Sequence, residues 1–169
     1  MRYYKIKSYA KINISLGILD KLKTKLHKIE SLISFINLHD EIFIKKINDK
    51  NHKIIFYGKF SKGIFKNNTI SNLLKLLEKK LSGQKFLIKI NKKIPSKSGM
   101  GGGSMNASSL LNFLIKNQKL NLSTKEIYKI SSKIGSDVII GLQNKTSILY
   151  GNGQIKYLNN KLNLYTLLI

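Results

Sequence analysis

The apolar residues of the chain recur with two different periods, and these periods predict its secondary structure. Stretches in which apolar and polar residues alternate, or in which β-branched residues dominate, are typical of strands. Such stretches cover residues 2–19, 29–38, 41–47, 53–57, 85–91, 145–150, 154–158 and 164–169, and the first has room for one or two strands.

Helical spacing appears in the middle of the chain. Across residues 69–81 the apolar side chains recur every three or four positions, which predicts a helix. A second helix is expected to open at Ser104, and a third is expected to start at a capping box, Ser123–Glu126, and to run to about Ile134. A short turn of helix is expected after Asp137. Strands and helices in this order indicate one α+β domain.

The segment before the second helix is unusually rich in glycine. Four of the five residues from Gly99 to Gly103 are glycine, and so dense a cluster needs a cause because glycine loses the most chain entropy on folding. One cause is a nest of main-chain N–H groups around an anion, to which the positive end of the helix near Ser104 adds. The loop lacks the Gly-Lys-Ser/Thr of a Walker motif and the spacing of a Rossmann loop. The alternative is a flexible glycine turn without a ligand.

Composition bounds the possible partners. The 31 Lys+Arg and 8 Asp+Glu residues give a formal net charge of +23, which raises nucleic acid or an anionic membrane as a partner. The lysines are scattered instead of gathered on one helix or tail, so we interpret them as a solvated surface and expect neither partner. A basic surface still favours a polyanionic small substrate such as a nucleotide.

The chain contains no cysteine, which excludes disulfides and zinc–thiolate sites. No apolar run approaches the about 18 residues that a membrane helix needs, and the start of the chain lacks the apolar core of a signal peptide. We therefore expect a cytoplasmic protein.

Four stretches together resemble one family. The segment PSKSGMGGGSMNASS, residues 95–109, resembles the phosphate loop of the GHMP kinases, the family of galactokinase, homoserine kinase and mevalonate kinase. SYAKINISLGI, LHKIESLISFINLHDEI and IGSDVII resemble, in order, the amino-terminal, cytidine-binding and catalytic motifs of one branch. That branch phosphorylates 4-diphosphocytidyl-2-C-methyl-D-erythritol.

The resemblance implies a fold and a reaction. The fold is the α+β amino-terminal domain of GHMP kinases, similar to a ribosomal-protein domain, with helices on one side of a mixed or antiparallel sheet. Residues 1–169 would form this ATP-binding domain. The reaction is ATP-dependent phosphorylation of the 2-hydroxyl of a cytidine diphosphate derivative, with Mg²⁺ expected beside ATP.

The resemblance also assigns roles to residues. Asp137 is the expected catalytic base, and Lys11 is expected to keep it ionised and to steady charge on the transferred group. Asn13, on the same strand face as Lys11, and His27 are expected at the substrate. ATP is expected at Asn68, Pro95, Ser96, Lys97, Ser98, Gly99, Met100, Gly101, Gly102, Gly103, Ser104 and Met105, and no metal ligand is assigned.

Several of these roles have a plainer alternative. On the residues alone, Asp137 fits equally a base and the cap of the short helix that follows it. Lys11 could be a strand lysine facing water, and His27 an ordinary surface residue. Asn68 could serve only as the N-cap of the predicted helix at Thr69.

The chain also departs from the family pattern. Leu26 stands where the family has a tyrosine, Lys25 where it has a glycine, Met105 where it has a second loop serine, and Ile139-Ile140 where it has Pro-Phe. The family's carboxy-terminal domain is expected to be absent, and a truncated sequence, a decaying gene and a split protein remain three explanations. In the last case a separate carboxy-terminal half is a candidate partner. A half-site is expected to bind nucleotide weakly and turn over poorly.

Two other functions remain open at this point, and a non-catalytic remnant is a third possibility. One is a GHMP kinase that acts on another small molecule, such as homoserine or mevalonate. The other is a basic nucleic-acid-binding module of similar fold, although the chain lacks a basic helix with interleaved aromatics, a zinc pattern and an RNP motif.

Overall fold

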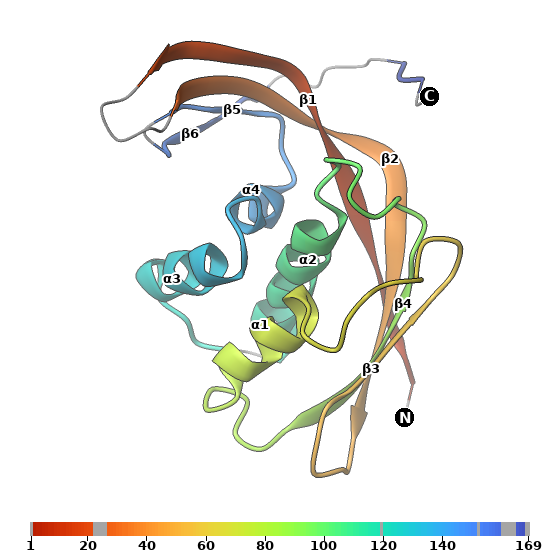
Figure 1. Cartoon of the computed structure of the whole chain (residues 1–169). Helices are drawn as coiled ribbons and strands as arrows, with labels where there is room; N and C mark the ends of the chain where they lie inside the picture. Colours follow the sequence, from red (N-terminus) through yellow and green to blue (C-terminus); the bar gives the residue numbers. More distant parts are fainter. Residues whose placement is uncertain (1, 22–26, 119, 152, 160–164, 168–169) are drawn as a thin grey trace.

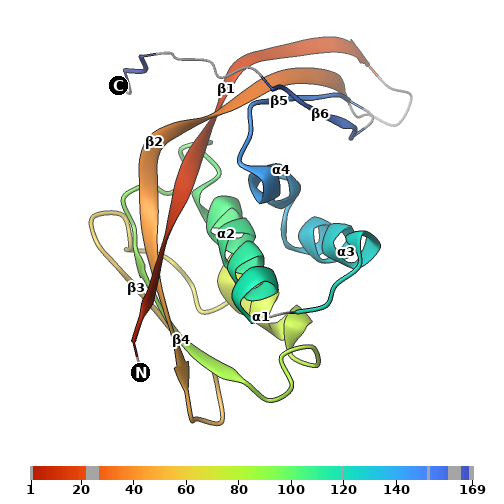
Figure 2. The same cartoon turned by 180° about the vertical axis from the view of Figure 1, so that it is seen from behind.

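The helices of the protein gather on one face of a bent sheet (Figures 1 and 2). The computed structural model describes residues 2–21, 27–118, 120–151, 153–159 and 165–167, without the side chains of residues 19–21 and 27–29. Within that part the sheet is six-stranded and mixed, since β3 and β4 are parallel and the other pairs antiparallel. The predicted α+β class, with helices on one side of a mixed sheet, is confirmed.

Two long antiparallel strands form the frame, β1 (Tyr4–Lys21) and β2 (His27–Ile47). Three register shifts interrupt their pairing, and such irregularities bend a strand and increase its twist. The prediction of separate strands at 29–38 and 41–47 is wrong, because β2 continues through the polar pair His39–Asp40, which stays in register with β1. The polar pair interrupts the apolar pattern of the sequence, but Asp40 is buried and hydrogen-bonded within the fold.

The remaining strands extend the sheet from β2. Strand β4 (Lys85–Asn91) pairs with the second half of β2, and β3 (Lys53–Tyr57) pairs with β4. Strand β5 (Ser147–Leu149) pairs with the first half of β2 and with β6 (Ile155–Tyr157).

The strand predicted at 164–169 is not confirmed. Residues 165–167 have no regular secondary structure, and the rest of that stretch lies outside the described residues. Tyr165 and Leu167 are exposed, 108% and 85%. An apolar run needs a neighbouring strand to pair with before it forms part of a sheet.

The helices follow the predicted order. They are α1 (Thr69–Leu77), α2 (Gly102–Asn117), α3 (Thr124–Ile134) and α4 (Val138–Gln143). Helix α3 has the predicted bounds, whereas α1 and α2 differ from prediction at one end. Helix α1 stops before Leu81. Helix α2 begins two residues before Ser104, because Gly101 adopts the left-handed conformation and the helix starts directly after it.

Helix α2 packs in the centre of the core. It contacts β1, β2 and the other three helices, and its residues Ala107, Leu110, Leu111 and Leu114 are fully buried. The sheet contributes Ile42, Ile44, Phe86, Ile88 and Ile90 to the same core, and α1 contributes Ile70, Leu73, Leu74 and Leu77. The amino-terminal end of α2 is therefore held by packing from several elements.

An ion-paired glutamate, Glu41, lies on the face of the sheet away from the helices, and it makes the folding stability of the protein depend on pH. Glu41 binds Lys5 at 2.5 Å and Lys93 at 2.9 Å, and these lysine hydrogen bonds lower the pKa of Glu41 from 4.5 to about 2. Because the pKa of Glu41 is lower in the folded than in the unfolded protein, its ionised carboxylate stabilises the fold above pH 4.5. This stabilisation is lost as the pH falls toward 2 and Glu41 becomes protonated. We expect Glu41→Gln to lower the free energy of unfolding at pH 7 but not at pH 2, as urea titration at both values would measure. An equal loss at both values would contradict the prediction.

Candidate active site

The glycine-rich loop joins the end of β4 to the start of α2 through left-handed backbone. Lys97, Gly99 and Gly101 have positive φ angles of 61°, 74° and 66°, a region that side-chain-bearing residues rarely adopt. At Gly101 a side chain would also be crowded, because a Cβ would lie 3.0 Å from Cγ of Lys11. Glycine is therefore favoured there by both conformation and space.

The N-terminus of α2 is open, unlike that of two neighbouring helices. Capping boxes close α1 through Asn68 and α3 through Ser123, whereas α2 follows Gly101 and has no side-chain cap hydrogen bond. The Met105 N–H donates to the Gly101 carbonyl oxygen at 2.8 Å. The N–H groups of the three residues before it have no acceptor within the helix, and such groups together with the helix dipole attract anions.

A lysine and an aspartate lie beside this helix end. The ammonium of Lys11 donates a 2.8 Å hydrogen bond to Oδ1 of Asn13 and lies 3.5 Å from Oδ2 of Asp137. Lys11 is only 8% exposed, so it is not a strand lysine facing water. Asp137 precedes α4, but its side chain makes no capping hydrogen bond, so the capping alternative gains no support.

The loop and the ion pair form one site. The Lys11 N–H donates to the Met100 carbonyl oxygen at 3.1 Å, which ties β1 to the loop. A Cβ placed on Gly101 would lie 3.6 Å from Oδ2 of Asp137, and one on Gly135 would lie 3.3 Å from Oγ of Ser104. Residues far apart in the sequence thus place a cation, a carboxylate and open main-chain N–H groups around the same point.

Comparison with known proteins identifies the family. Residues 68–152, about half of the chain, match the GHMP kinases N terminal domain. The chain belongs to this family. The family assignment agrees with the predicted fold and with the resemblance of the glycine loop.

Two curated relatives of the chain are kinases that share one name. The chain is 55% identical over 169 residues to the 4-diphosphocytidyl-2-C-methyl-D-erythritol kinase of Pelagibacter ubique, covering 99% of this chain and 60% of the relative. It is 37% identical to the kinase of the same name from Petrotoga mobilis, covering 89% of this chain and 57% of the relative. The chain thus spans about 60% of the length of these kinases.

Solved structures show the same fold. A crystal structure of 4-(cytidine 5'-diphospho)-2C-methyl-D-erythritol kinase superimposes with a TM-score of 0.77 at 22% identity, over 92% of this chain and 55% of that one. Homoserine kinase from Cytophaga hutchinsonii gives a TM-score of 0.65 at 16% identity, over 94% of this chain and 52% of that one. At these identities the likeness establishes the GHMP fold alone.

The structure does not place the side chains of two other predicted contact residues, Asn68 and His27, in the site. Asn68 is the N-cap of α1: its Oδ1 accepts from Ile70 and Ser71 N–H, and its Nδ2 donates to Phe65 and Lys66 carbonyl oxygens. All four interactions are local, so the structure supports the capping alternative for Asn68. The side chain of His27 lies outside the described residues.

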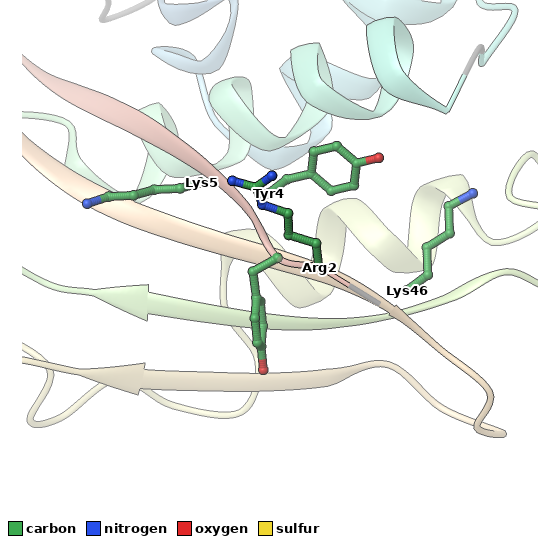
Figure 3. Close-up of a pocket in the computed structure, with 5 residues that line it drawn as sticks. Arg2, Tyr4, Lys5 and Lys46 are labelled. Atoms are coloured by element: carbon green, nitrogen blue, oxygen red, sulfur yellow. The ribbon is translucent and has the colours of Figure 1, made fainter.

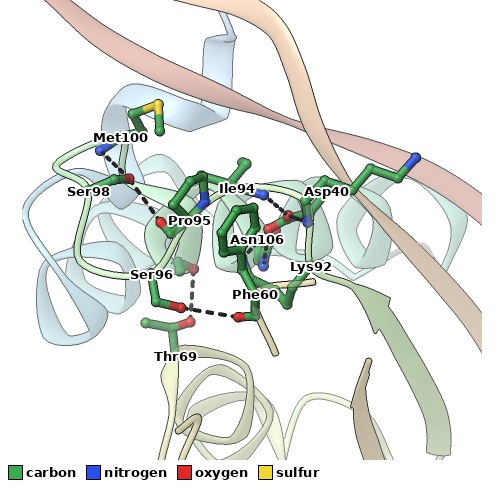
Figure 4. A network of polar contacts seen from close by, with 12 residues as sticks. Asp40, Phe60, Thr69, Lys92, Ile94, Pro95, Ser96, Ser98, Met100 and Asn106 are labelled. Carbon is green, nitrogen blue, oxygen red and sulfur yellow. Dashed lines mark hydrogen bonds and ion pairs between the residues drawn. The ribbon is translucent and has the colours of Figure 1, made fainter. Parts of the chain in front are cut away.

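Three residues of the predicted phosphate loop use their side chains elsewhere. Ser96 and Ser98 donate to main-chain carbonyl oxygens of Phe60 and Pro95, at 3.2 and 2.9 Å, and so brace the loop (Figure 4). The side chain of Met105 is 1% exposed and faces Gly141 of α4. The Met105 side chain therefore belongs to the core, and the prediction that Met105 contacts ATP stays a prediction that its side chain does not support.

Sequence reasoning missed two residues that hold the loop. Thr69 donates from Oγ1 to the Gly103 carbonyl oxygen at 2.8 Å and joins α1 to the start of α2. Asp40 is fully buried and accepts hydrogen bonds from the segment that leads into the loop (Figure 4). A signal was available for Asp40, because it lies on the same strand face as the buried Ile42 and Ile44, where a carboxylate needs partners.

The described residues offer no preformed metal site and no membrane span. They contain no group of three His, Cys, Asp or Glu side chains that could hold a metal ion. No helix in the described ranges has the length and apolar character needed to cross a membrane.

A basic hollow lies at the amino-terminal end of β1, away from the candidate site. It is lined by Arg2, Tyr3, Tyr4, Lys5 and Lys46. Figure 3 shows that the Lys5 and Lys46 side chains point in opposite directions, so they do not converge on one anion. This hollow adds no support to the nucleic-acid alternative.

Proposed function

We propose that the chain is the ATP-binding domain of a kinase that transfers the γ-phosphoryl group of ATP to the 2-hydroxyl of 4-diphosphocytidyl-2-C-methyl-D-erythritol. The observation that carries the proposal is the uncapped start of α2 beside the Lys11–Asp137 pair. The names of the two relatives supply the substrate. Phosphoryl transfer requires this combination, namely fixed donors for the phosphates and a place for the hydroxyl proton.

Asp137 accepts the proton of the substrate hydroxyl in this proposal. Its side chain is 31% exposed and so is accessible to a substrate, and its Oδ2 lies 3.5 Å from the Lys11 ammonium. Asn13 Oδ1 accepts a hydrogen bond from the Lys11 ammonium at 2.8 Å and so restricts its position near Asp137. Lys11 also stabilises the negative charge that develops on the substrate oxygen.

The glycine loop holds the phosphates. The N–H groups of Gly102, Gly103 and Ser104 open toward the loop, and the left-handed Gly99 and Gly101 let main chain approach the anion without side chains between them. ATP supplies the phosphoryl group, and we propose that Mg²⁺ accompanies it without assigning a protein ligand. Asn13 and His27 remain the proposed contacts to the substrate, and a cytoplasmic location is proposed because ATP is a cytoplasmic metabolite.

Residues 1–169 act in this proposal as the amino-terminal domain. Because the chain spans about 60% of the relatives' length, the polypeptide that the relatives add is proposed to supply further contacts to the bound nucleotide. Positioning contributes most of the rate of phosphoryl transfer, so a chain without those contacts should turn over slowly.

A phosphate-transfer assay tests the proposal. We expect the chain, alone or mixed with the part of the Pelagibacter ubique kinase that it does not cover, to phosphorylate 4-diphosphocytidyl-2-C-methyl-D-erythritol and neither homoserine nor mevalonate. Turnover on homoserine or mevalonate alone would redirect the proposal to another GHMP kinase. ATP binding too weak to detect, together with tight RNA binding that falls steeply with salt, would favour the nucleic-acid module instead.

A further inference from the structure

One buried carboxylate binds both ends of the glycine-rich loop. Oδ1 of Asp40 accepts hydrogen bonds from the N–H groups of Lys93 and Ile94, at 2.7 and 2.9 Å, directly before the loop. Oδ2 of Asp40 accepts from Nδ2 of Asn106 at 3.0 Å, in the second turn of α2, directly after the loop. Figure 4 shows Ile94 and Asn106 approaching Asp40 from separate segments. The two anchor points of the loop are therefore fixed relative to each other by one side chain.

The charge of Asp40 is neutralised inside the protein. The ammonium of Lys92 forms an ion pair with Oδ2, and the two side chains are 5% and 0% exposed. Removing one partner of such a pair leaves an uncompensated buried charge, whereas replacing both with groups of similar volume is often tolerated. The pair can therefore be changed in matched double variants without leaving a lone charge.

The Asp40–Lys92 pair also limits how closely the start of α2 can pack against the segment that follows β4. A Cβ on Gly102 would lie 3.2 Å from Nζ of Lys92 and 3.2 Å from Cγ2 of Ile94. The first residue of α2 thus rests against the lysine that Asp40 neutralises. Glycine at position 102 serves this close packing, which places the open N–H groups of the helix over the loop.

We propose that Asp40 is a positioning residue for the nucleotide. It acts through Lys93, Ile94 and Asn106, and it sets the spacing between the start of the loop and the start of α2 before any ligand arrives. This inference rests on the proposed function, because the loop is taken to hold phosphates. It adds that the hydrogen-bonding capacity of a buried side chain, and not the glycines alone, shapes the phosphate site.

The orientation of Asn106 supports this assignment. Its amide is 1% exposed, and its Oδ1 has no hydrogen-bond partner among the described residues. A buried polar atom without a partner costs free energy, so the amide is kept for its other atom, Nδ2, which donates to Asp40. An aliphatic side chain of similar size would avoid that cost if this position served packing alone.

Two asparagine-to-alanine variants on the same helix separate positioning from general stability. Asn106→Ala removes the hydrogen bond to Asp40, and Asn112→Ala removes a 2.7 Å hydrogen bond from Nδ2 to the Leu142 carbonyl oxygen, away from the loop. We expect Asn106→Ala to weaken ATP binding about tenfold, since a displacement of about 1 Å is enough for losses of this order, and Asn112→Ala to leave it unchanged. Calorimetric titration with ATP and Mg²⁺ measures both. Equal affinities in the two variants would overturn the inference.

A second pair of variants tests the carboxylate itself. Asp40→Asn/Lys92→Met and Asp40→Ala/Lys92→Met both remove the buried charges, but only the first keeps an oxygen that can accept from Lys93 and Ile94. We expect the first to bind ATP within about threefold of the unaltered chain and the second about tenfold more weakly. Equal binding by the two would contradict a positioning role.

Hydrogen exchange of the ATP-free protein separates this inference from the proposed function. Asn106→Ala should raise exchange in residues 93–104 relative to Asn112→Ala, because the loop loses one of its anchors. If the unaltered chain binds no ATP, the proposed function fails and the exchange comparison still decides whether Asp40 orders the loop. Unchanged exchange in residues 93–104 would overturn the inference even if ATP binds.

Discussion

Replacing Asp137 with asparagine should lower phosphoryl transfer at least about a hundredfold and change ATP affinity by less than about twofold. Positioned general bases contribute about 10²- to 10⁴-fold, and an amide of the same shape cannot accept the hydroxyl proton. ATP affinity should persist because the open N–H groups of α2 and the loop backbone do not depend on this side chain. The measurement is kcat with 4-diphosphocytidyl-2-C-methyl-D-erythritol beside a direct titration of ATP.

Asp49→Asn is the matched control for this variant. Asp49 forms a surface ion pair with Lys53 at 2.5 Å, outside the proposed site, so removing its charge should affect neither rate nor affinity. Turnover of Asp137→Asn equal to that of the unaltered chain would remove Asp137 from the mechanism. Loss of both turnover and ATP affinity would instead assign Asp137 a structural role at the start of α4.

Introducing an aspartate at Gly103 should stabilise the fold and abolish most ATP binding. A Cβ on Gly103 meets only Thr69, at 3.5 and 3.6 Å, so the side chain fits, and φ is not in the left-handed region. A carboxylate in the first turn of α2 interacts favourably with the helix dipole, by about 0.3–1 kcal/mol. The same carboxylate repels phosphates bound there, and like charges about 5 Å apart near a protein surface should weaken ATP about tenfold to a hundredfold.

Gly103→Asn provides the uncharged control for this variant. Asparagine has nearly the same shape, so any affinity that it retains beyond Gly103→Asp reports charge repulsion by the phosphates. Thermal unfolding would measure the stability change, and titration with ATP would measure the affinity. Unchanged ATP binding in Gly103→Asp would mean that the glycine loop is only a turn.

Gly102 is a less suitable position for the same experiment. Any side chain there would meet Lys92 and Ile94 at 3.2 Å, so a loss of binding would mix steric crowding with charge repulsion. An aspartate at Gly102 would also lie beside the Lys92 ammonium and disturb its pairing with Asp40. The two adjacent glycines therefore have different surroundings and serve different purposes, although the residue type is the same.

The sequence alone determined the elements whose signals are local. Alternation predicted β3 and β4, the spacing of apolar residues predicted α1, and the capping box at Ser123 and Glu126 predicted the start of α3. The period of two also placed Lys11 and Asn13 on one strand face, where they are hydrogen-bonded. These predictions succeeded because period and capping depend on residues within a few positions of one another.

Only the tertiary structure decided what depends on distant partners. It joined two predicted strands into β2 across Asp40, left residues 165–167 outside regular secondary structure, and moved the Met105 side chain into the core. It also brought Lys11, Gly101 and Asp137 together from three segments and revealed the partners of Asp40 in the segment that follows β4 and in α2. The physical reason is that a buried charge or a strand edge is satisfied by groups far along the chain, and only the folded packing places those groups within hydrogen-bonding distance.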